Sequence, residues 1–279
     1  MGKKIGFVTD STADIPNDII QRYAIQVIPA IITMGEQTYT DGIQISREDF
    51  YTRLPDLNPL PQTSAPSAGS FQEVYERLLS RGMDTVISIH PPPTLSGIYN
   101  AAWLAAREFG GRVHVLDGGQ ISLGLGFQVI LAVEAARAGS SLENLLAYLE
   151  GLRKRVRVAA LLDTIEYVRR SGRVSWALAA IGGFLHLQPL LEVRQGIVHR
   201  IGQARTRLQG IAHLYQVLNS WGPVERLAVL HTNAEAAARQ LLEEVKNRVS
   251  VPPLFVNVTT VIGTHVGPNG LGFAAVPAS

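Results

Sequence analysis

The sequence predicts an α/β fold made of two domains. The N-terminal domain is expected to have a mainly parallel sheet with flanking helices, and the second, α+β domain a mixed or antiparallel sheet. The length of 279 residues corresponds to about two domains of ordinary size. Strand and helix patterns alternate through the first half, which is typical of parallel sheets, whereas the second half mixes a hairpin pattern with helices. We place the boundary so that the domains span 1–155 and 156–279.

Apolar, strand-like runs alternate with helical patterns along the first half. Asp14 is the expected N-cap of a short helix, and Pro16 fits its first turn. Ser46 begins a near capping box, with Asp49 where Glu or Gln is usual. The region 55–66 is rich in Pro, Asn and Ser and is expected to be a loop. We expect strands at 4–9, 25–33, 84–90 and 112–116, and helices at 47–54, 67–80, 96–109 and 122–138.

In the second half, the dipeptide Gln195-Gly196 separates two strand-like runs and predicts a β-hairpin. Helices and strands otherwise follow one another without a fixed repeat. We expect helices at 141–155, 164–171, 175–186, 204–219 and 234–248, and strands at 156–162, 188–194, 197–202, 225–231, 254–260 and 271–276.

The composition excludes several classes of function. With 46% hydrophobic and 17% charged residues, the chain is ordinary for a globular protein. The absence of Cys excludes disulfides, Cys-ligated zinc, iron–sulfur clusters and a thiol nucleophile. The seven His residues show no metal-binding spacing, so we expect no metal and no cofactor. Because no apolar run is long enough to span a membrane and no apolar signal segment opens the chain, we expect a cytoplasmic protein without stable membrane insertion.

The positive charge is unevenly distributed along the chain. The net charge is only +2, which does not indicate nucleic-acid binding. The segment 151–210, however, holds eleven basic and three acidic residues, so the rest of the chain is net negative. This asymmetry suggests a positive face for an acidic partner. A set of solvated helix faces explains the same asymmetry equally well.

Three segments dense in hydroxyl groups, 10–14, 63–67 and 94–97, follow expected strands or precede expected helices. In open α/β sheets, ligands bind at the carboxyl ends of the strands, where helix N-termini favour anionic groups. Each Ser or Thr could equally be a simple helix cap. The presence of three such segments in one half shifts the balance towards a site for a carboxylate or phosphate.

The sequence shows little evidence of catalytic motifs. Ser96 lacks a nucleophile elbow, and no phosphate-binding loop is present. Asp10 follows a strand as an aspartyl nucleophile would, but the spacing of the next acid is too loose. The glycines of 118–126 fit close helix packing better than a dinucleotide fingerprint. Of the histidines, His265 is the better functional candidate than His90, because glycines on both sides let the backbone approach a ligand.

Taken together, these segments resemble the DegV family of bacterial fatty-acid-binding proteins. Each motif alone is weak, but six of them occur in the family's order over nearly the whole chain. The matching motifs are Val8-Thr9-Asp10-Ser11-Thr12-Ala13-Asp14-Ile15-Pro16, Thr63-Ser64-Ala65-Pro66-Ser67, Leu95-Ser96-Gly97-Ile98-Tyr99, Tyr167-Val168-Arg169-Arg170-Ser171-Gly172-Arg173-Val174, Gln188-Pro189-Leu190-Leu191 and Gly267-Pro268-Asn269-Gly270-Leu271-Gly272.

The resemblance implies a non-catalytic protein that holds one long-chain fatty acid between two domains. By the same resemblance, Thr63 and Ser96 hold the carboxylate, and His265 supports the head group. Some relatives present the bound carboxylate to the ATP-using subunit of a fatty acid kinase, and Arg173 resembles a residue implicated in docking that subunit. The sequence departs from the family's pattern at 91–94, where Pro-Pro-Pro-Thr replaces a Ser pair, at Gly118, which replaces a Ser, and at Gln188, which replaces a Lys.

The residue pattern is itself compatible with a protein that binds a fatty acid. Apolar side chains of 121–133 and 176–191 could line a tunnel for an acyl chain, although most such residues belong to the core. Two other hypotheses remain open. One is a small-molecule hydrolase or phosphoryl-transfer enzyme that uses Asp10 or Ser96. The other is an interaction protein whose basic segment 151–210 binds an acidic partner without any ligand.

Overall fold

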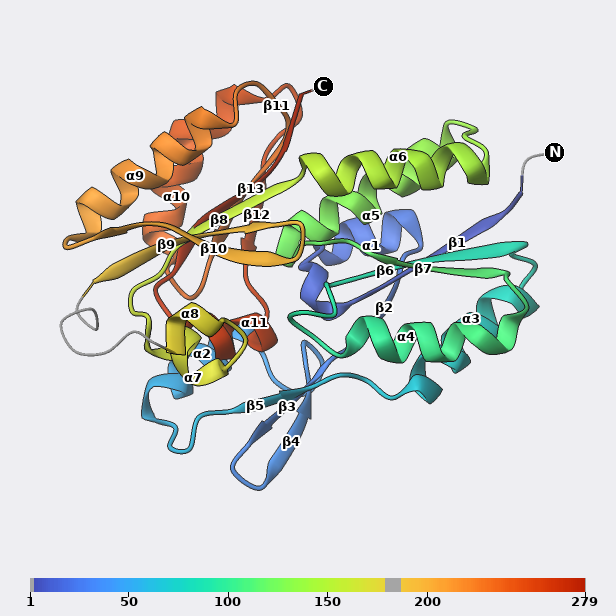
Figure 1. Ribbon diagram of the computed structural model, residues 1–279, viewed down its shortest axis with the longest axis horizontal. Coiled ribbons are helices and arrows are strands. Elements are labelled where there is room, and N and C mark those ends of the chain that lie inside the picture. Colours follow the sequence, from blue (N-terminus) through green and yellow to red (C-terminus); the bar gives the residue numbers. More distant parts are fainter. Residues whose placement is uncertain (1–2, 179–186, 279) are drawn as a thin grey trace.

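The computed structural model describes residues 3–178 and 187–278 and arranges their strands in three sheets (Figure 1). The first is a parallel sheet with the strand order β2-β1-β6-β7. This confirms the parallel arrangement expected for the first half. The strands are β1 (Ile5–Asp10), β2 (Gln26–Ile28), β6 (Thr85–His90) and β7 (Val113–Asp117).

Helices cover both faces of this parallel sheet. On one face, α3 (Ala68–Ser80) and α4 (Ile98–Ala106) pack against it, with Phe71 and Tyr75 fully buried. On the other face lies α5 (Ser122–Arg137), followed by α6 (Leu142–Arg155). The short helix α1 (Asn17–Tyr23) packs at the side of α5.

The second sheet has six strands in the order β10-β9-β8-β13-β11-β12 and is antiparallel except for the pair β11–β12. It confirms the expected mixed sheet and the hairpin at Gln195-Gly196. Helices α9 (Arg207–Ser220) and α10 (Glu235–Val245) cover its outer face. The strands are β8 (Arg157–Leu161), β9 (Gln188–Arg194), β10 (Ile197–Ala204), β11 (Val224–His231), β12 (Leu254–Asn257) and β13 (Leu271–Pro277).

Helix α5 lies between the two larger sheets and contributes to one core with both of them. Its first twelve residues, Ser122–Val133, are all buried. Gly124 and Gly126 make this possible, because a Cβ atom would lie 2.4 Å from a Val158 methyl group at the first and 2.5 Å from the Ala13 carbonyl at the second. The expectation that these glycines permit close packing is therefore confirmed.

The third sheet was not expected from the sequence. Its antiparallel order is β4-β3-β5, formed by β3 (Ile31–Met34), β4 (Gln37–Thr40) and β5 (Gln62–Ser64). The single strand expected at 25–33 is wrong, because the chain passes from β2 into a different sheet at β3. Strand β5 lies inside the region expected to be a loop. Helix α2 (Arg47–Arg53) begins at the expected cap, Ser46.

Two further expectations about local structure are wrong. Asp14 does not cap α1. It ends the 3₁₀ turn η1 (Ser11–Ala13) in a left-handed conformation, and its buried carboxylate accepts hydrogen bonds from the Ser122 hydroxyl and the Thr259 amide. The strand expected to reach residue 260 ends at Asn257, and α11 (Thr260–Val266) follows.

The remaining helices are α7 (Glu166–Ser171) and α8 (Ser175–Leu178). The helix expected at 175–186 is described only as far as Leu178, and its remainder lies outside the described residues. Within residues 3–178 and 187–278, no helix is both long and apolar enough to cross a membrane.

Candidate functional site

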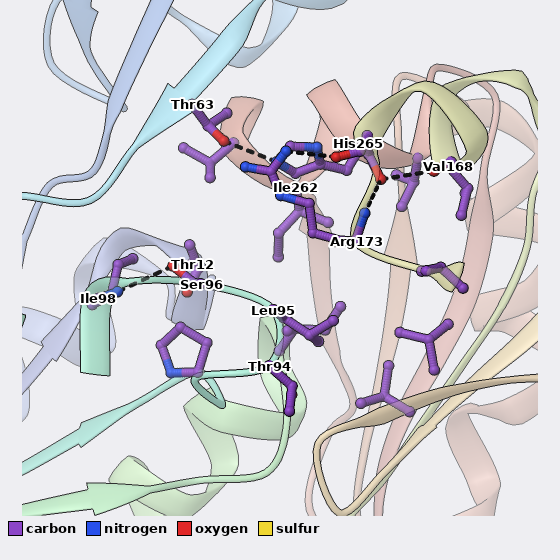
Figure 2. Close-up of a pocket in the computed structure, with 18 of the residues that line it drawn as sticks. Thr12, Thr63, Thr94, Leu95, Ser96, Ile98, Val168, Arg173, Ile262 and His265 are labelled. Carbon is purple, nitrogen blue, oxygen red and sulfur yellow. Dashed lines mark hydrogen bonds between the residues drawn. The ribbon is translucent and has the colours of Figure 1, made fainter. Parts of the chain in front are cut away.

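A pocket of about 480 Å³ lies where the three sheets approach one another (Figure 2). Its size is within the range of small-molecule sites, and its wall is mainly apolar. All four residues that the sequence singled out as site residues line this one pocket. They are Thr63, Ser96, Arg173 and His265.

Thr63 and His265 form a hydrogen-bonded pair at the polar end of the pocket. The Thr63 hydroxyl lies 2.9 Å from Nε2 of His265 (Figure 2). Thr63 is placed by β5, where it pairs with Ile32, rather than by a helix start as the sequence suggested. The helix cap in this segment is Ser67, four residues later. His265 comes from the last turn of α11, some 200 residues away in the sequence.

The environment of His265 keeps its ring neutral. Burial lowers its pKa to about 4, and the positive charge of Arg173 acts in the same direction. Its Nδ1 atom is buried and has no hydrogen-bond partner among the described residues. An unpaired buried polar atom is costly, so this nitrogen is suited to a ligand that fills the pocket.

Ser96 supplies a free hydroxyl proton to the pocket. It lies in the turn before α4, and its oxygen accepts a hydrogen bond from the Ile98 amide at 3.3 Å. Because the oxygen is the acceptor in this contact, the hydroxyl can donate to a ligand. Thr12 lies beside Ser96 in Figure 2, but its hydroxyl donates to the Asp10 carboxylate at 2.5 Å. The start of a helix thus places Ser96 as the sequence predicted.

Asp10 and His90 belong to a buried network behind the pocket wall. One carboxylate oxygen of Asp10 accepts from Thr12, and the other lies 2.7 Å from Nδ1 of His90. Nε2 of His90 contacts the Ser88 hydroxyl, which contacts Tyr75. Asp10 and His90 are fully buried and do not line the pocket. Asp10 is therefore not placed to attack a ligand held in this pocket; it lines a separate cavity together with Asp14 and Asp41.

Arg173 follows Gly172, which ends α7 in a left-handed conformation. The side chain is exposed, and its guanidinium donates to the Ser171 carbonyl at 2.7 Å. Figure 2 shows it pointing towards His265 across the pocket. It therefore combines access to solvent, as the sequence suggested, with a place at the polar end of the pocket.

The basic segment 151–210 is partly neutralised in the fold. Among the described residues, three of its basic side chains pair with acids from outside the segment: Arg153 with Asp117 at 2.8 Å, Lys154 with Glu150 at 3.1 Å and Arg155 with Glu225 at 3.3 Å. Arg157 and Arg194 pair with Glu192, and Arg169 and Arg170 with Glu166, which are acids of the segment itself. The sequence asymmetry thus overstates the positive charge offered to a partner by the three outside pairs.

The apolar wall comes from loops, helices and strands together. Of the expected lining segments, Ile121 and Leu191 reach the pocket and most of 122–133 is core, while residues 179–186 of the expected segment 176–191 lie outside the described residues. The sequence patterns did not single out the alternating residues of β8, β9 and β10, for which the only signal is a period of two. These missed residues are Val158, Ala160, Val193 and Val198. Among the described residues, no group of three His, Asp or Glu side chains is placed to hold a metal ion.

The fold and the pocket define a class: α/β proteins that enclose an apolar cavity between two sheets, with a small polar group at one end. Within that class, the chain belongs to the DegV family. The family model described as "Uncharacterised protein, DegV family" matches residues 4–278. The resemblance inferred from the six sequence motifs is confirmed.

Relatives and solved structures match this chain over nearly its full length. The chain is 33% identical over 276 residues to a DegV domain-containing protein of Streptomyces coelicolor, covering 98% of each. It is similar in structure to a fatty acid binding DegV family protein of Thermus thermophilus, with a TM-score of 0.90, 33% identity, and coverage of 99% of this chain and 100% of that one. DegV of Bacillus subtilis, described as a fatty acid binding protein, matches with a TM-score of 0.88, 32% identity and the same coverage.

Proposed function

We propose that this protein binds one long-chain fatty acid in the pocket, between domains that span 1–155 and 156–279. The observation that carries the proposal is the pocket itself: an apolar cavity that Thr63, Ser96 and His265 all line, with Thr63 and His265 hydrogen-bonded to each other. The two DegV structures described as fatty acid binding support it, since they match this chain in fold and at over 30% identity.

The polar end is suited to a carboxylate. The Ser96 hydroxyl has a proton to donate, and the Thr63–His265 pair offers a second donor. Which atom of that pair donates depends on the tautomer of the neutral ring. The guanidinium of Arg173 adds positive charge at the same place. Hydrogen bonds to a charged group contribute about 1.5–3 kcal/mol each.

The apolar wall supplies most of the affinity in this proposal. Each buried methylene contributes about 0.8 kcal/mol, so a long acyl chain exceeds the polar contacts in total. The polar contacts then set which end of the ligand lies at which end of the pocket.

We further propose that the protein is a non-catalytic cytoplasmic carrier that presents the carboxylate to an ATP-using kinase subunit. Arg173 supports this step, because it is exposed and yet lines the polar end, where a docked partner would reach the carboxylate. The alternative of a hydrolase that uses Ser96 has less support: among residues 3–178 and 187–278, the partner of the Ser96 oxygen is the Ile98 amide, which donates to it, rather than a base.

The test is native mass spectrometry of the purified protein, followed by extraction of bound lipid. We expect an added mass in the range of a long-chain fatty acid, and uptake of palmitate or oleate by protein from which lipid has been removed. Repeated spectra without added mass, together with no uptake of either acid, would refute the proposal.

A further inference from the structure

The turn of the β9–β10 hairpin crosses the pocket to meet the first half of the chain. The Thr94 hydroxyl donates to the Gly196 carbonyl at 2.7 Å, and the Gly196 amide donates to the Gly119 carbonyl at 2.8 Å. Thr94 lines the pocket, as do Val193 and Val198 on the two arms of the hairpin. The hairpin and the loop that follows β6 are therefore two walls that meet along a seam.

The loop side of the seam has few donors. Pro91, Pro92 and Pro93 have no amide hydrogen, so their backbone cannot donate to the hairpin. The Thr94 hydroxyl supplies the donor instead. The same short loop positions Ser96, because the Pro92 carbonyl accepts from the amides of Leu95 and Ser96 at 2.9 and 3.1 Å.

At Gly196 the turn of the hairpin approaches the loop at 91–94 closely, but the contact involves few atoms. The φ of Gly196, +81°, is a left-handed conformation, and a Cβ atom there would lie 3.0 Å from Cβ of Pro92. The hairpin is paired through β9 to β8, whereas β10 is the edge strand of the sheet. The pairing of β9 with β8 ends at Val193, so the turn at 194–197 extends beyond this ladder and can move without breaking it.

Other walls of the pocket are held by more contacts. The face formed by β8 and β9 is a continuous ladder of backbone pairs. Helix α11 is held at its start by the Thr259 amide to Asp14 and by the Tyr51 hydroxyl to the Val258 carbonyl, and at its end by His265 to Thr63. Among the described residues, the β9 arm is held by the Gln120 side-chain amide, which donates to the Val193 carbonyl at 2.9 Å, whereas the turn itself is held to the first half by the two hydrogen bonds of Gly196. The turn is therefore the less firmly held part of this wall.

We infer that the seam between the β9–β10 turn and the loop at 91–94 is the door through which the ligand enters and leaves, and that Thr94 is a positioning residue that keeps it closed. This inference rests on the proposed fatty acid function. A door has a kinetic signature: weakening it speeds binding and release together and leaves the dissociation constant nearly unchanged. A contact that only stabilises the bound ligand changes release alone.

The first experiment compares Thr94→Val with Thr52→Val. Thr52 makes a similar hydroxyl-to-carbonyl bond on α2 and does not line the pocket. Stopped-flow fluorescence with a dansyl-labelled long-chain fatty acid would give both rate constants. We expect both to rise about fivefold in Thr94→Val, as the loss of one hydrogen bond implies, and neither to change in Thr52→Val. A faster release with unchanged association, or no change, would overturn the inference.

The second experiment cross-links the two sides of the seam. The chain has no Cys, and a Cβ atom at Gly196 would lie 3.0 Å from Cβ of Pro92. A disulfide needs about 3.5–4.5 Å between Cβ atoms, so a small opening of the turn lets Pro92→Cys with Gly196→Cys form a single disulfide. The oxidised protein should neither take up nor release the labelled acid, and reductant should restore exchange in the same sample. Equal exchange of the labelled acid in the oxidised and the reduced protein would overturn the inference that the ligand passes through the seam. Fatty acid binding by the unmodified protein is measured first, so a failure of the proposed function would be seen separately.

Discussion

The two ends of the pocket are built in different ways. The polar side chains come from five separate segments, namely Thr12, Thr63, Ser96, Arg173 and His265. Part of the apolar wall comes from alternate residues of neighbouring strands, with Val158 opposite Val193 and Ala160 opposite Leu191 in the β8–β9 ladder, and the rest comes from loops and helices, as at Leu95, Val174 and Ile262. In the proposed function, the apolar wall contributes most of the binding energy, while single polar residues from distant segments decide orientation.

The largest effect should come from the apolar end. Shortening the fatty acid by four methylene groups removes about 3 kcal/mol of burial, or a factor of more than a hundred in the dissociation constant. Isothermal titration with saturated acids of decreasing length would measure it. The same shortening should raise the dissociation constant of the Ser96→Ala protein by an equal factor, because the two ends of the ligand are distant from each other. An affinity independent of chain length would mean that the apolar wall is not the binding surface.

The next largest effect should come from Ser96→Ala. Loss of a hydrogen bond to a carboxylate weakens binding by roughly tenfold or more. A fatty alcohol of the same length should bind the variant and the parent protein alike, because it lacks the charge.

Ser67→Ala is the matched control for this substitution. Ser67 caps α3 by accepting from the Ser70 amide, but it does not line the pocket. Ser67→Ala should lose about 1 kcal/mol of stability, because it removes a helix cap, while only Ser96→Ala should lose affinity. Equal affinities of parent and Ser96→Ala protein for acid and alcohol would remove Ser96 from the polar end.

A smaller effect on affinity is expected for Arg173→Ala. The side chain is exposed, and exposed charge pairs contribute about 0.2–1 kcal/mol, which is at most about fivefold. Acyl phosphate formation with the kinase subunit should fall much further, and added salt should weaken docking in the parent protein. Arg170→Ala, three residues earlier and outside the pocket, serves as control. Turnover equal to that of the parent would exclude Arg173 from the docking surface.

The smallest effect is expected from the protonation of His265. Its pKa is lowered to about 4 by burial and by Arg173, so the ring stays neutral between pH 5.5 and 8, and it should add no pH dependence to affinity there. The free energy of unfolding behaves differently. A lowered folded-state pKa gives stability that is complete above about 6.5 and is lost as pH falls towards 4. NMR titration of the ring would check this; protonation above pH 6 would contradict it.

The sequence predicted regular elements well where local patterns decide them. The parallel strands, the hairpin at Gln195-Gly196 and the cap at Ser46 follow from apolar periodicity and side-chain chemistry. Strand β5 could not be predicted in the same way, because its three residues pair with β3, some 30 positions away. Helix α11 was missed because its β-branched residues, Val261, Ile262 and Thr264, are typical of strands.

The candidate site was predicted by family resemblance more than by local pattern. Thr63, Ser96 and Arg173 lie in the motifs, His265 lies just before the last of them, and the fold brings all four to one pocket. The hydrogen bond between Thr63 and His265 could not be predicted, since it depends on how α11 packs against β5. Asp14 shows the converse: a residue that looks like a cap is instead held by Ser122 and Thr259 from distant segments.

The position of α5 limits how the chain can be divided. Leu123, Val129 and Val133 share one buried cluster with Val158 of β8 and with Ala274 of β13. A fragment ending near residue 155 would leave this helix face in contact with water, where apolar surface favours association. Such a fragment would be a poor module for fusion or domain exchange, and heating should melt both sheets in a single transition. A designer who wants to graft this pocket elsewhere has to move the whole chain.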